Sequence, residues 1–116
     1  RPRLQRRAAS ILQPEMGHTG VTQFMRIGQM AQAFHCRLIP HASIGIGIFQ
    51  AASLHATAAL EHVPYHEYQH SIFDKNLRYV TGNMSCGTGA YTVPTGPGLG
   101  VEPSDQAWTH IRPKLS

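Results

Sequence analysis

No hydrophobic run in the 116-residue sequence approaches the roughly 20 residues of a membrane-spanning helix, so no membrane partner is expected. Cysteine is scarce: Cys36 and Cys86 stand alone, without the Cys-x-x-Cys spacing of a redox or zinc motif. Two isolated thiols fit a reducing compartment, which predicts a cytoplasmic protein. The basic start RPRLQRRAAS has no apolar core behind it, so it lacks the pattern of a secretory signal peptide.

Acidic residues are also few, six against ten Lys and Arg, and the net charge is +4. Much of the excess lies in one cluster, formed by Arg1, Arg3, Arg6 and Arg7. A nucleic-acid surface would need aromatic residues among these arginines, or more basic residues elsewhere; neither occurs, so no nucleic-acid partner is expected. The cluster is interpreted as the solvated face of a helix. A non-catalytic module that binds a partner through this start and the C-terminal tail stays open as an alternative.

Three short stretches have the composition of strands: SILQPE at 10–15, RLIPHA at 37–42 and PYHEYQ at 64–69. Between them lie two helical patterns, GVTQFMRIGQMAQAFH at 20–35 and GIFQAASLHATAAL at 47–60, with apolar or small residues at helical spacing. This alternation predicts βαβ units, and therefore an α/β fold with parallel strands and right-handed crossovers. The length suits one domain with a core. Because the chain starts without Met and with a helix under way, we expect a piece of a longer protein.

A polar residue capable of acid–base chemistry stands at or near the end of each predicted strand: Glu15, His41 and Glu67. The residue number rises by 26 at each step, from 15 to 41 and from 41 to 67. In parallel α/β proteins the active site lies at the C-terminal ends of the strands, so these three side chains are predicted to converge there. His18, in the loop after the first strand, is predicted to contact the substrate.

The stretch YHEYQH contains His66-Glu67-x-x-His70, which has the spelling of a zinc-hydrolase motif. A zinc site requires both histidines on one helical face, yet Pro64 would leave His66 in the first helical turn at best. In a strand, residues four apart lie about 13 Å apart and cannot share one ion. The repeat favours the strand. The zinc hydrolase stays as an alternative, and no metal ligand is assigned within this sequence.

The segments ILQPEMGHTGVTQFMRIGQMAQAF, LIPHASIGIGIFQAASLHATAAL and HEYQ resemble the enolase superfamily, and the ending YTVPTGPGLGVE is similar to its C-terminal segment. Within that superfamily the sequence looks like the mandelate racemase group, which includes acid-sugar dehydratases. The resemblance implies a partial TIM-like barrel of the (β/α)₇β type. Residues 1–73 would hold barrel strands six to eight, and residues 74–116 would return toward a capping domain. This second part is rich in Gly, Pro and Thr, which predicts mainly turns and loop around one strand at 90–93. Its stretch GPGLG is interpreted as a loop and not as a phosphate-binding motif.

The same resemblance implies roles for the strand-end residues. His41 matches the base of the seventh strand, Glu15 the carboxylate that orients the base, and Glu67 the acid that hydrogen-bonds the substrate carboxylate. Two positions depart from the pattern, because Glu15 is often Asp in the family and Gly20-Val21 replaces the frequent Gly-Gly.

The implied activity is dehydration of a sugar acid, a carbon–oxygen lyase reaction, with racemisation or epimerisation as the near alternative. The implied cofactor is Mg²⁺, with its ligands in upstream strands that this sequence lacks. A homo-oligomer is implied for the full-length enzyme, and this piece alone is expected to be inactive.

Overall fold

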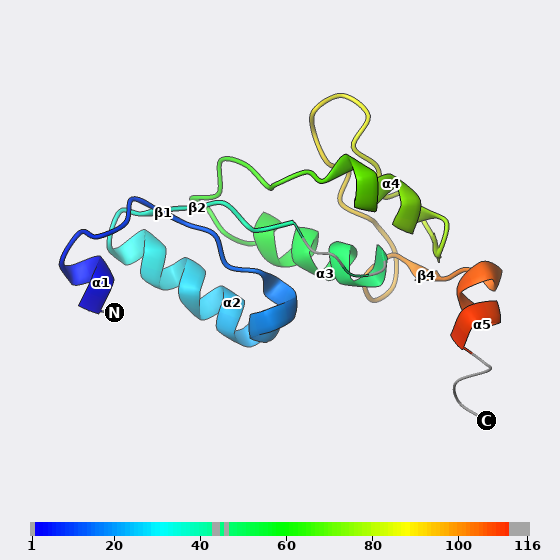
Figure 1. Ribbon diagram of the computed structural model, residues 1–116, viewed down its shortest axis with the longest axis horizontal. Helices are drawn as coiled ribbons and strands as arrows, with labels where there is room; N and C mark the ends of the chain where they lie inside the picture. Colours follow the sequence, from blue (N-terminus) through cyan, green and yellow to red (C-terminus); the bar gives the residue numbers. More distant parts are fainter. Residues whose placement is uncertain (1, 43–44, 46, 112–116) are drawn as a thin grey trace.

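The computed structural model describes residues 2–42, 45 and 47–111, which form a mixed α/β fold with extents of 49 × 35 × 27 Å (Figure 1). In chain order the elements are α1 (Pro2–Gln5), β1 (Ile11–Leu12), α2 (Met16–Ala33), β2 (Arg37–Leu38), α3 (Gly47–Ala58), α4 (His70–Leu77), β3 (Val80–Thr81), β4 (Glu102–Pro103) and α5 (Asp105–Ile111). No helix in this described part is long and apolar enough to cross a membrane.

The first two strands pair in parallel, with Ile11 opposite Arg37 and Leu12 opposite Leu38. A helix, α2, connects them and packs against β2 and α3. This arrangement confirms the predicted α/β class and the parallel pairing of its first two strands. The described residues do not close a barrel, since the parallel sheet contains only β1 and β2.

The predicted strands are shorter in the structure than the sequence suggested. Regular pairing covers only two residues of each of the first two, and the stretch at 64–69 is extended without being a strand. Each of the three contains a proline, Pro14, Pro40 or Pro64, which has no N–H to donate to a neighbouring strand. The prolines thus interrupt the hydrogen-bond ladder near the ends of the segments.

Both predicted helices form, as α2 and α3, and α2 contains a break at its start. Gly20 has φ 71° and ψ 161°, outside the helical region, so a short turn that includes His18 precedes the regular helix. Glycine adopts such a positive φ at little cost because it has no Cβ. The regular part of α2 therefore begins close to the predicted residue 20.

The C-terminal part departs more from expectation. The predicted strand at 90–93 is reduced to one isolated bridge between Ser85 and Thr92. A short antiparallel pair, β3 and β4, and the helices α4 and α5 form where the sequence indicated mainly loop. These elements are short, with eight residues in α4, seven in α5 and two in each strand, so none is long enough to show a clear period in the sequence.

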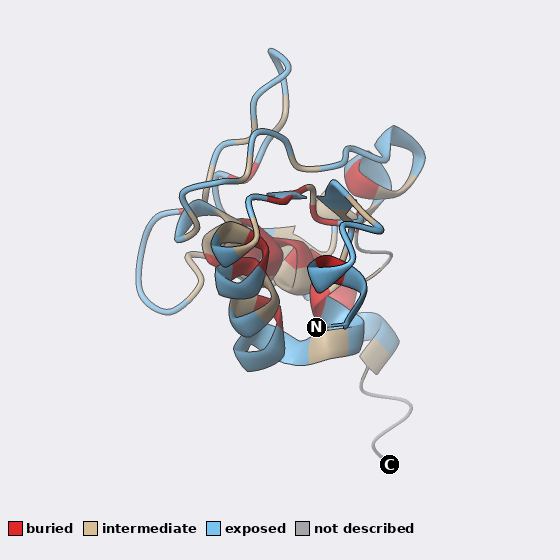
Figure 2. Cartoon of the chain, turned by 90° about the vertical axis from the view of Figure 1, so that its left-hand side faces the viewer, coloured by how far each residue is buried: buried red, intermediate tan, exposed pale blue. Residues whose placement is uncertain are grey.

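Buried residues form two clusters, and α3 contributes to both (Figure 2). The first joins α1, α2, β2 and α3 and consists of Leu4, Met16, Phe24, Ala31, Cys36, Leu38 and Ala56. The second joins α3, α4 and the C-terminal segment and consists of Ala51, Leu54, Phe73, Met84 and Val101. The small side chains predicted on one face of α3 include Ala51, which is completely buried. Cys36 and Cys86 are free thiols.

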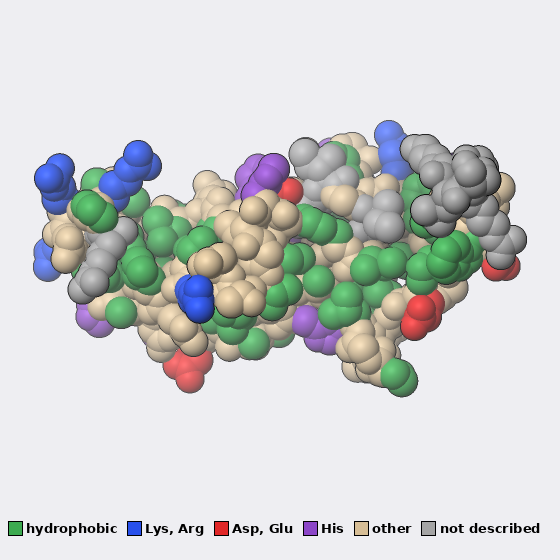
Figure 3. Space-filling view, turned by 90° about the horizontal axis from the view of Figure 1, so that it is seen from below, with side chains coloured by type: hydrophobic (Ala, Val, Ile, Leu, Met, Phe, Trp, Pro, Cys, Tyr) green, Lys and Arg blue, Asp and Glu red, His purple; other side chains and the backbone are tan. Residues whose placement is uncertain are grey.

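The basic cluster lies at one end of the molecule, away from most of the core. Arg3 on α1 and Arg6 and Arg7 just after it are exposed, and Figure 3 shows Lys and Arg side chains gathered at that end. Arg1 lies outside the described residues. These exposed positions fit the interpretation of a solvated helix face.

Phe24 is predicted to be a main stabilising residue of the first cluster, since none of its surface is exposed. Phe24→Ala should lower the free energy of unfolding by about 3–5 kcal/mol, because a cavity replaces the ring. Val21→Ala, on the same helix at a position that is 50% exposed, should change it by no more than about 0.5 kcal/mol. Urea unfolding followed by circular dichroism measures both, and equal losses in the two variants would contradict the assigned core.

Candidate active site

Glu15, His41 and Glu67 lie at the same end of three parallel segments that main-chain hydrogen bonds hold in register. The N–H of His41 donates to the carbonyl of Pro14 at 3.1 Å, and the N–H of Glu67 donates to the carbonyl of Pro40 at 3.2 Å. In each case the acceptor is the proline directly before the preceding residue of the set. Because the same hydrogen bond recurs between each pair of neighbouring segments, the three side chains start at the same height along the parallel segments.

Glu15 and His41 form the closest pair. Glu15 is the N-cap residue of α2, and its Oε2 lies 3.3 Å from Nδ1 of His41. A carboxylate accepts hydrogen bonds, so a neutral His41 fits this contact with its hydrogen on Nδ1 and the lone pair of Nε2 free. The Glu15 side chain is only 15% exposed, whereas that of His41 is 47% exposed. A shielded carboxylate orienting an accessible imidazole is an arrangement suited to a general base.

Glu67 faces the free nitrogen of that imidazole. Its Oε2 lies 3.9 Å from Nε2 of His41 and accepts a hydrogen bond from the N–H of Ala42 at 2.7 Å. No hydrogen bond joins the second oxygen, Oε1, to the described residues, and the side chain is 42% exposed. A ligand can therefore reach a carboxyl oxygen and the candidate base from the same side.

His18 belongs to the same group of side chains. Its Nε2 lies 3.3 Å from Oε2 of Glu15, the oxygen that also contacts His41, and its side chain is 83% exposed. The structure thus brings together all four residues singled out in the sequence. Proximity alone assigns no role, so the catalytic roles of Glu15, His41 and Glu67 and the substrate contact of His18 stay predictions.

Three further residues contact the backbone of Glu67, directly or through one another, and were not predicted as part of this site: Ser53, His66 and Tyr91. Nδ1 of His66 and the hydroxyl of Tyr91 each lie 2.9 Å from the main-chain oxygen of Glu67, and Oγ of Ser53 lies 2.9 Å from Nε2 of His66. Burial lowers the pKa of His66 below its usual 6.5, although the hydrogen bond and charge of Glu67 act in the opposite direction. One signal in the sequence could have indicated this position of His66. In an extended segment successive side chains point to opposite faces, so His66 lies on the face opposite that of Glu67.

The zinc-hydrolase alternative is wrong. Residues 63–69 are not helical and α4 begins only at His70, so His66 and His70 do not share a helical face. Within the described ranges no three His, Cys, Asp or Glu side chains are grouped to hold a metal ion. Mg²⁺ prefers several oxygen ligands, whereas His18 and His41, which lie beside the two glutamates, offer nitrogen. The residues that the structure describes therefore do not fit a magnesium site.

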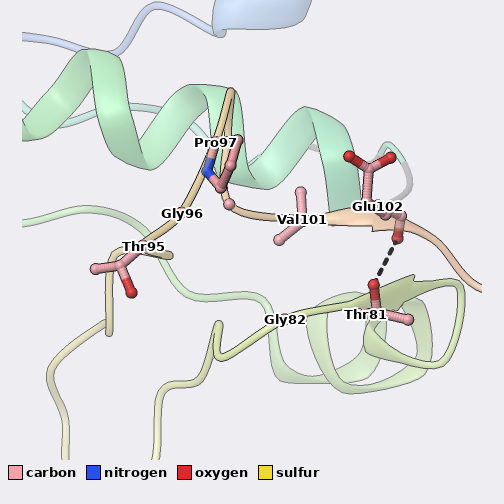
Figure 4. Close-up of a pocket in the computed structure, with 8 residues that line it drawn as sticks. Thr81, Gly82, Thr95, Gly96, Pro97, Val101 and Glu102 are labelled. Carbon is pink, nitrogen blue, oxygen red and sulfur yellow. Dashed lines mark hydrogen bonds between the residues drawn. The ribbon is translucent and has the colours of Figure 1, made fainter.

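The glycine-rich loop lines a separate cavity of about 190 Å³, which Figure 4 shows in close-up. Its walls are mostly backbone and small side chains, with one hydrogen bond from the Thr81 hydroxyl to the Glu102 carbonyl at 3.4 Å. The loop closes on itself, since the N–H of Gly100 donates to the carbonyl of Pro97 at 3.1 Å. Glu102 is the one acid in this lining, so the cavity does not offer the paired acid and base found around His41.

The model of the family "Enolase C-terminal domain-like" matches residues 1–107. An arabinonate dehydratase from Saccharolobus solfataricus is 30% identical over 118 residues, which cover 96% of this chain and 30% of the dehydratase. A D-galactarolactone cycloisomerase from Agrobacterium fabrum is 29% identical over 121 residues, which cover 90% of this chain and 30% of the cycloisomerase.

A crystal structure from Sinorhizobium meliloti, provisionally described as an isomerase with an open loop, is 62% identical with a TM-score of 0.89. That similarity covers 93% of this chain and 29% of the solved one. The chain spans about 30% of the length of the curated relatives it matches.

The lowered pKa of His66 predicts a specific pH dependence of stability. The unfolded chain binds a proton at His66 as the pH falls through 6.5, while the folded chain resists that proton. The stabilisation from the neutral, buried ring is thus fully present above pH 6.5 and is lost as the pH falls below it.

The free energy of unfolding of the wild type, minus that of His66→Asn, should therefore decrease from about pH 8 to about pH 5. Asn does not titrate, and every other group is common to both proteins. Urea unfolding at each pH gives the difference, and a value that stays constant across this range would contradict the assignment.

Proposed function

Because this chain belongs to the enolase C-terminal domain-like family, we propose that it is part of an enzyme that removes the proton α to the carboxylate of a sugar acid. The observation that carries the proposal is the position of His41, between the carboxyl groups of Glu15 and Glu67. An accessible base beside two carboxyl groups, one shielded and one exposed, suits abstraction of a weakly acidic proton next to a carboxylate.

In this proposal residues 1–73 are strands six to eight of a (β/α)₇β barrel, and residues 74–116 return toward a capping domain. The parallel pairing of β1 and β2, the recurring 26-residue spacing and the similarity to one region of a longer solved chain support it. The remaining strands would be supplied by polypeptide outside this chain. The isolated 116 residues would then lack both a closed barrel and a means of excluding water, and we expect them to be inactive.

His41 acts as the base in the proposed reaction. Glu15 accepts the hydrogen of Nδ1 and holds the ring so that the lone pair of Nε2 points away from it. Nε2 takes the α proton, and the electron pair of the broken C–H bond moves into the carboxylate group to give an enediolate. Glu67 carries a proton on Oε1 in this proposal and donates it in a hydrogen bond to the substrate carboxylate, on which negative charge develops. The exposed His18 contacts the substrate beside Glu15.

The second half of the reaction expels an oxygen from the carbon β to the carboxylate. The electron pair of the enediolate forms a C=C bond as the C–O bond breaks, and the imidazolium of His41 returns its proton to the leaving oxygen. When that oxygen is a hydroxyl, water leaves and the reaction is a dehydration. An arabinonate dehydratase among the relatives supports this outcome, which we propose first.

The second candidate outcome is an isomerisation. When the β oxygen belongs to a ring, the same elimination opens the ring and no water is lost. The cycloisomerase among the relatives, and the 62% identical structure provisionally described as an isomerase, favour this alternative. Racemisation or epimerisation would need a proton donor on the opposite face of the enediolate, beyond the four residues described above.

Enolase-superfamily sites use one or two Mg²⁺ ions to stabilise such an intermediate. The described residues provide no ligand set, so the ligands in this proposal belong to polypeptide outside the chain. Binding of Mg²⁺ and loss of the α proton should therefore be separable by substitutions within these 116 residues.

His41→Asn in the full-length protein should reduce exchange of the α proton with solvent by at least about 10²-fold, because the base is lost. Binding of Mg²⁺ should stay close to that of the wild type. A screen of sugar acids in D₂O, read by NMR, measures exchange, and calorimetric titration measures the metal. His62→Asn, at an exposed histidine, is the matched control. Retained exchange, or loss of the metal, would contradict the role of His41.

Glu15→Gln keeps the shape of the side chain but removes the charge that orients His41. The exchange rate should fall by roughly 10²–10⁴-fold, the range typical of general-base assistance. Glu61→Gln is a matched control, since Glu61 is exposed and bonds only Gln32 among the described side chains, at 3.3 Å. An exchange rate that is unchanged in Glu15→Gln would rule out the pairing.

A further inference from the structure

The main-chain oxygen of Glu67 accepts two side-chain hydrogen bonds. The hydroxyl of Tyr91 donates to it at 2.9 Å, and Nδ1 of His66 lies at the same distance. The two donors come from different parts of the chain, one from the C-terminal segment and one from the residue next to Glu67. This carbonyl is therefore held from two directions.

These contacts determine where the hydrogens of His66 lie. A carbonyl oxygen only accepts, so Nδ1 of His66 must carry a hydrogen. In the neutral ring Nε2 is then an acceptor, and it receives the hydrogen of the Ser53 hydroxyl at 2.9 Å. Ser53 lies on α3 and is completely buried. The carbonyl of Glu67 thus fixes the tautomer of His66, and the buried hydroxyl of Ser53 on α3 holds the opposite side of the ring.

The pKa values of both donors agree with this arrangement. Burial lowers the pKa of His66, which keeps the ring neutral near pH 7, and burial raises the pKa of Tyr91, which keeps its hydroxyl protonated. The Tyr91 ring is also fixed by packing, since it meets the rings of His66 and Phe73 edge to face at 5.3 Å in each case. Neither donor is free to turn away from Glu67.

Two other polar groups of Glu67 are engaged as well. Its N–H donates to Pro40, and its Oε2 accepts from Ala42, on either side of His41. The segment that carries Glu67 is not a regular strand, so a sheet does not fix its backbone angles. Individual hydrogen bonds hold it instead. They connect the backbone of Glu67 to Pro40 in the segment of His41, to Tyr91 in the C-terminal segment and, through His66, to Ser53 on α3.

We propose that Ser53, His66 and Tyr91 are positioning residues that hold Glu67 at the correct distance from His41. This inference rests on the proposed function, in which Glu67 hydrogen-bonds the substrate carboxylate as charge develops. A carboxyl oxygen that shifts by an ångström no longer meets that charge, and misplacement of this size can cost about 10²-fold in rate. The three residues touch no reacting atom and act only through Glu67.

Tyr91→Phe removes one hydroxyl and leaves the ring packing in place. In the full-length protein it should lower kcat about 10- to 100-fold with little change in KM, because the lost interaction matters mainly in the transition state. Tyr68→Phe is the matched control: its hydroxyl donates to Asp74 at 3.0 Å, and its ring packs beside that of Tyr91 at 5.9 Å. Tyr68→Phe should keep the wild-type kcat. Equal rates in the two variants would overturn the proposal.

A double-mutant cycle separates positioning from a general structural effect. In a Glu67→Gln background, Tyr91→Phe should reduce kcat by less than about twofold, since the group it positions is already altered. Equal losses in the two backgrounds would show that Tyr91 acts elsewhere, and would overturn the proposal.

The tautomer of His66 tests the same arrangement without an assay of activity. ¹⁵N NMR of the full-length protein labelled at histidine should place the hydrogen on Nδ1. Ser53→Ala should shift the Nε2 resonance, because this nitrogen loses its hydrogen-bond donor, whereas Ser53→Thr should leave it close to the wild-type position. A hydrogen on Nε2 in the wild type would overturn the proposal. If no sugar acid reacts, the proposed function fails and this measurement still decides whether Glu67 is held as described.

Discussion

The register of three parallel segments is the constraint on which the site depends. The N–H groups of His41 and Glu67 donate to the carbonyls of Pro14 and Pro40, each one residue before the preceding member of the set. A shift of one residue would turn a side chain to the opposite face of the segment. The prolines accept these bonds but cannot donate, so the segments remain paired at their ends without forming longer strands. This pairing places Glu15, His41 and Glu67 on one level.

A complete enzyme of the proposed kind would combine acid–base residues with a metal site in a closed barrel. This chain contains the proposed base, the carboxylate proposed to orient it and the carboxyl group proposed to meet the substrate, all close together. Its described residues lack a metal ligand set and a closed sheet. The relatives are about three times longer, since the chain covers 30% of each curated one. Proton transfer and charge neutralisation would therefore depend on different parts of one polypeptide.

Much of the fold near the site was predictable because it repeats. Two strands and two helices at a constant spacing gave the α/β class, and the same spacing brought Glu15, His41 and Glu67 together. Strand lengths were overestimated, since composition does not show how a proline interrupts pairing. The contacts behind Glu67 were not predictable: Ser53 and Tyr91 lie 13 residues or more away in sequence, and only packing joins them to His66. His66 was considered only within the alternative zinc motif, because its spacing to His70 would suit a helix.

The central claim is that His41 and Glu67 act on one substrate carboxylate and its neighbouring carbon. The most direct test is a crystal structure of the full-length protein bound to a sugar-acid analogue that lacks the β oxygen expelled in the reaction. We expect the ligand carboxylate to be hydrogen-bonded to Glu67 and the α carbon to lie about 3–3.5 Å from Nε2 of His41. A ligand whose α carbon lies beyond the reach of His41, or whose carboxylate binds away from Glu67, would contradict it.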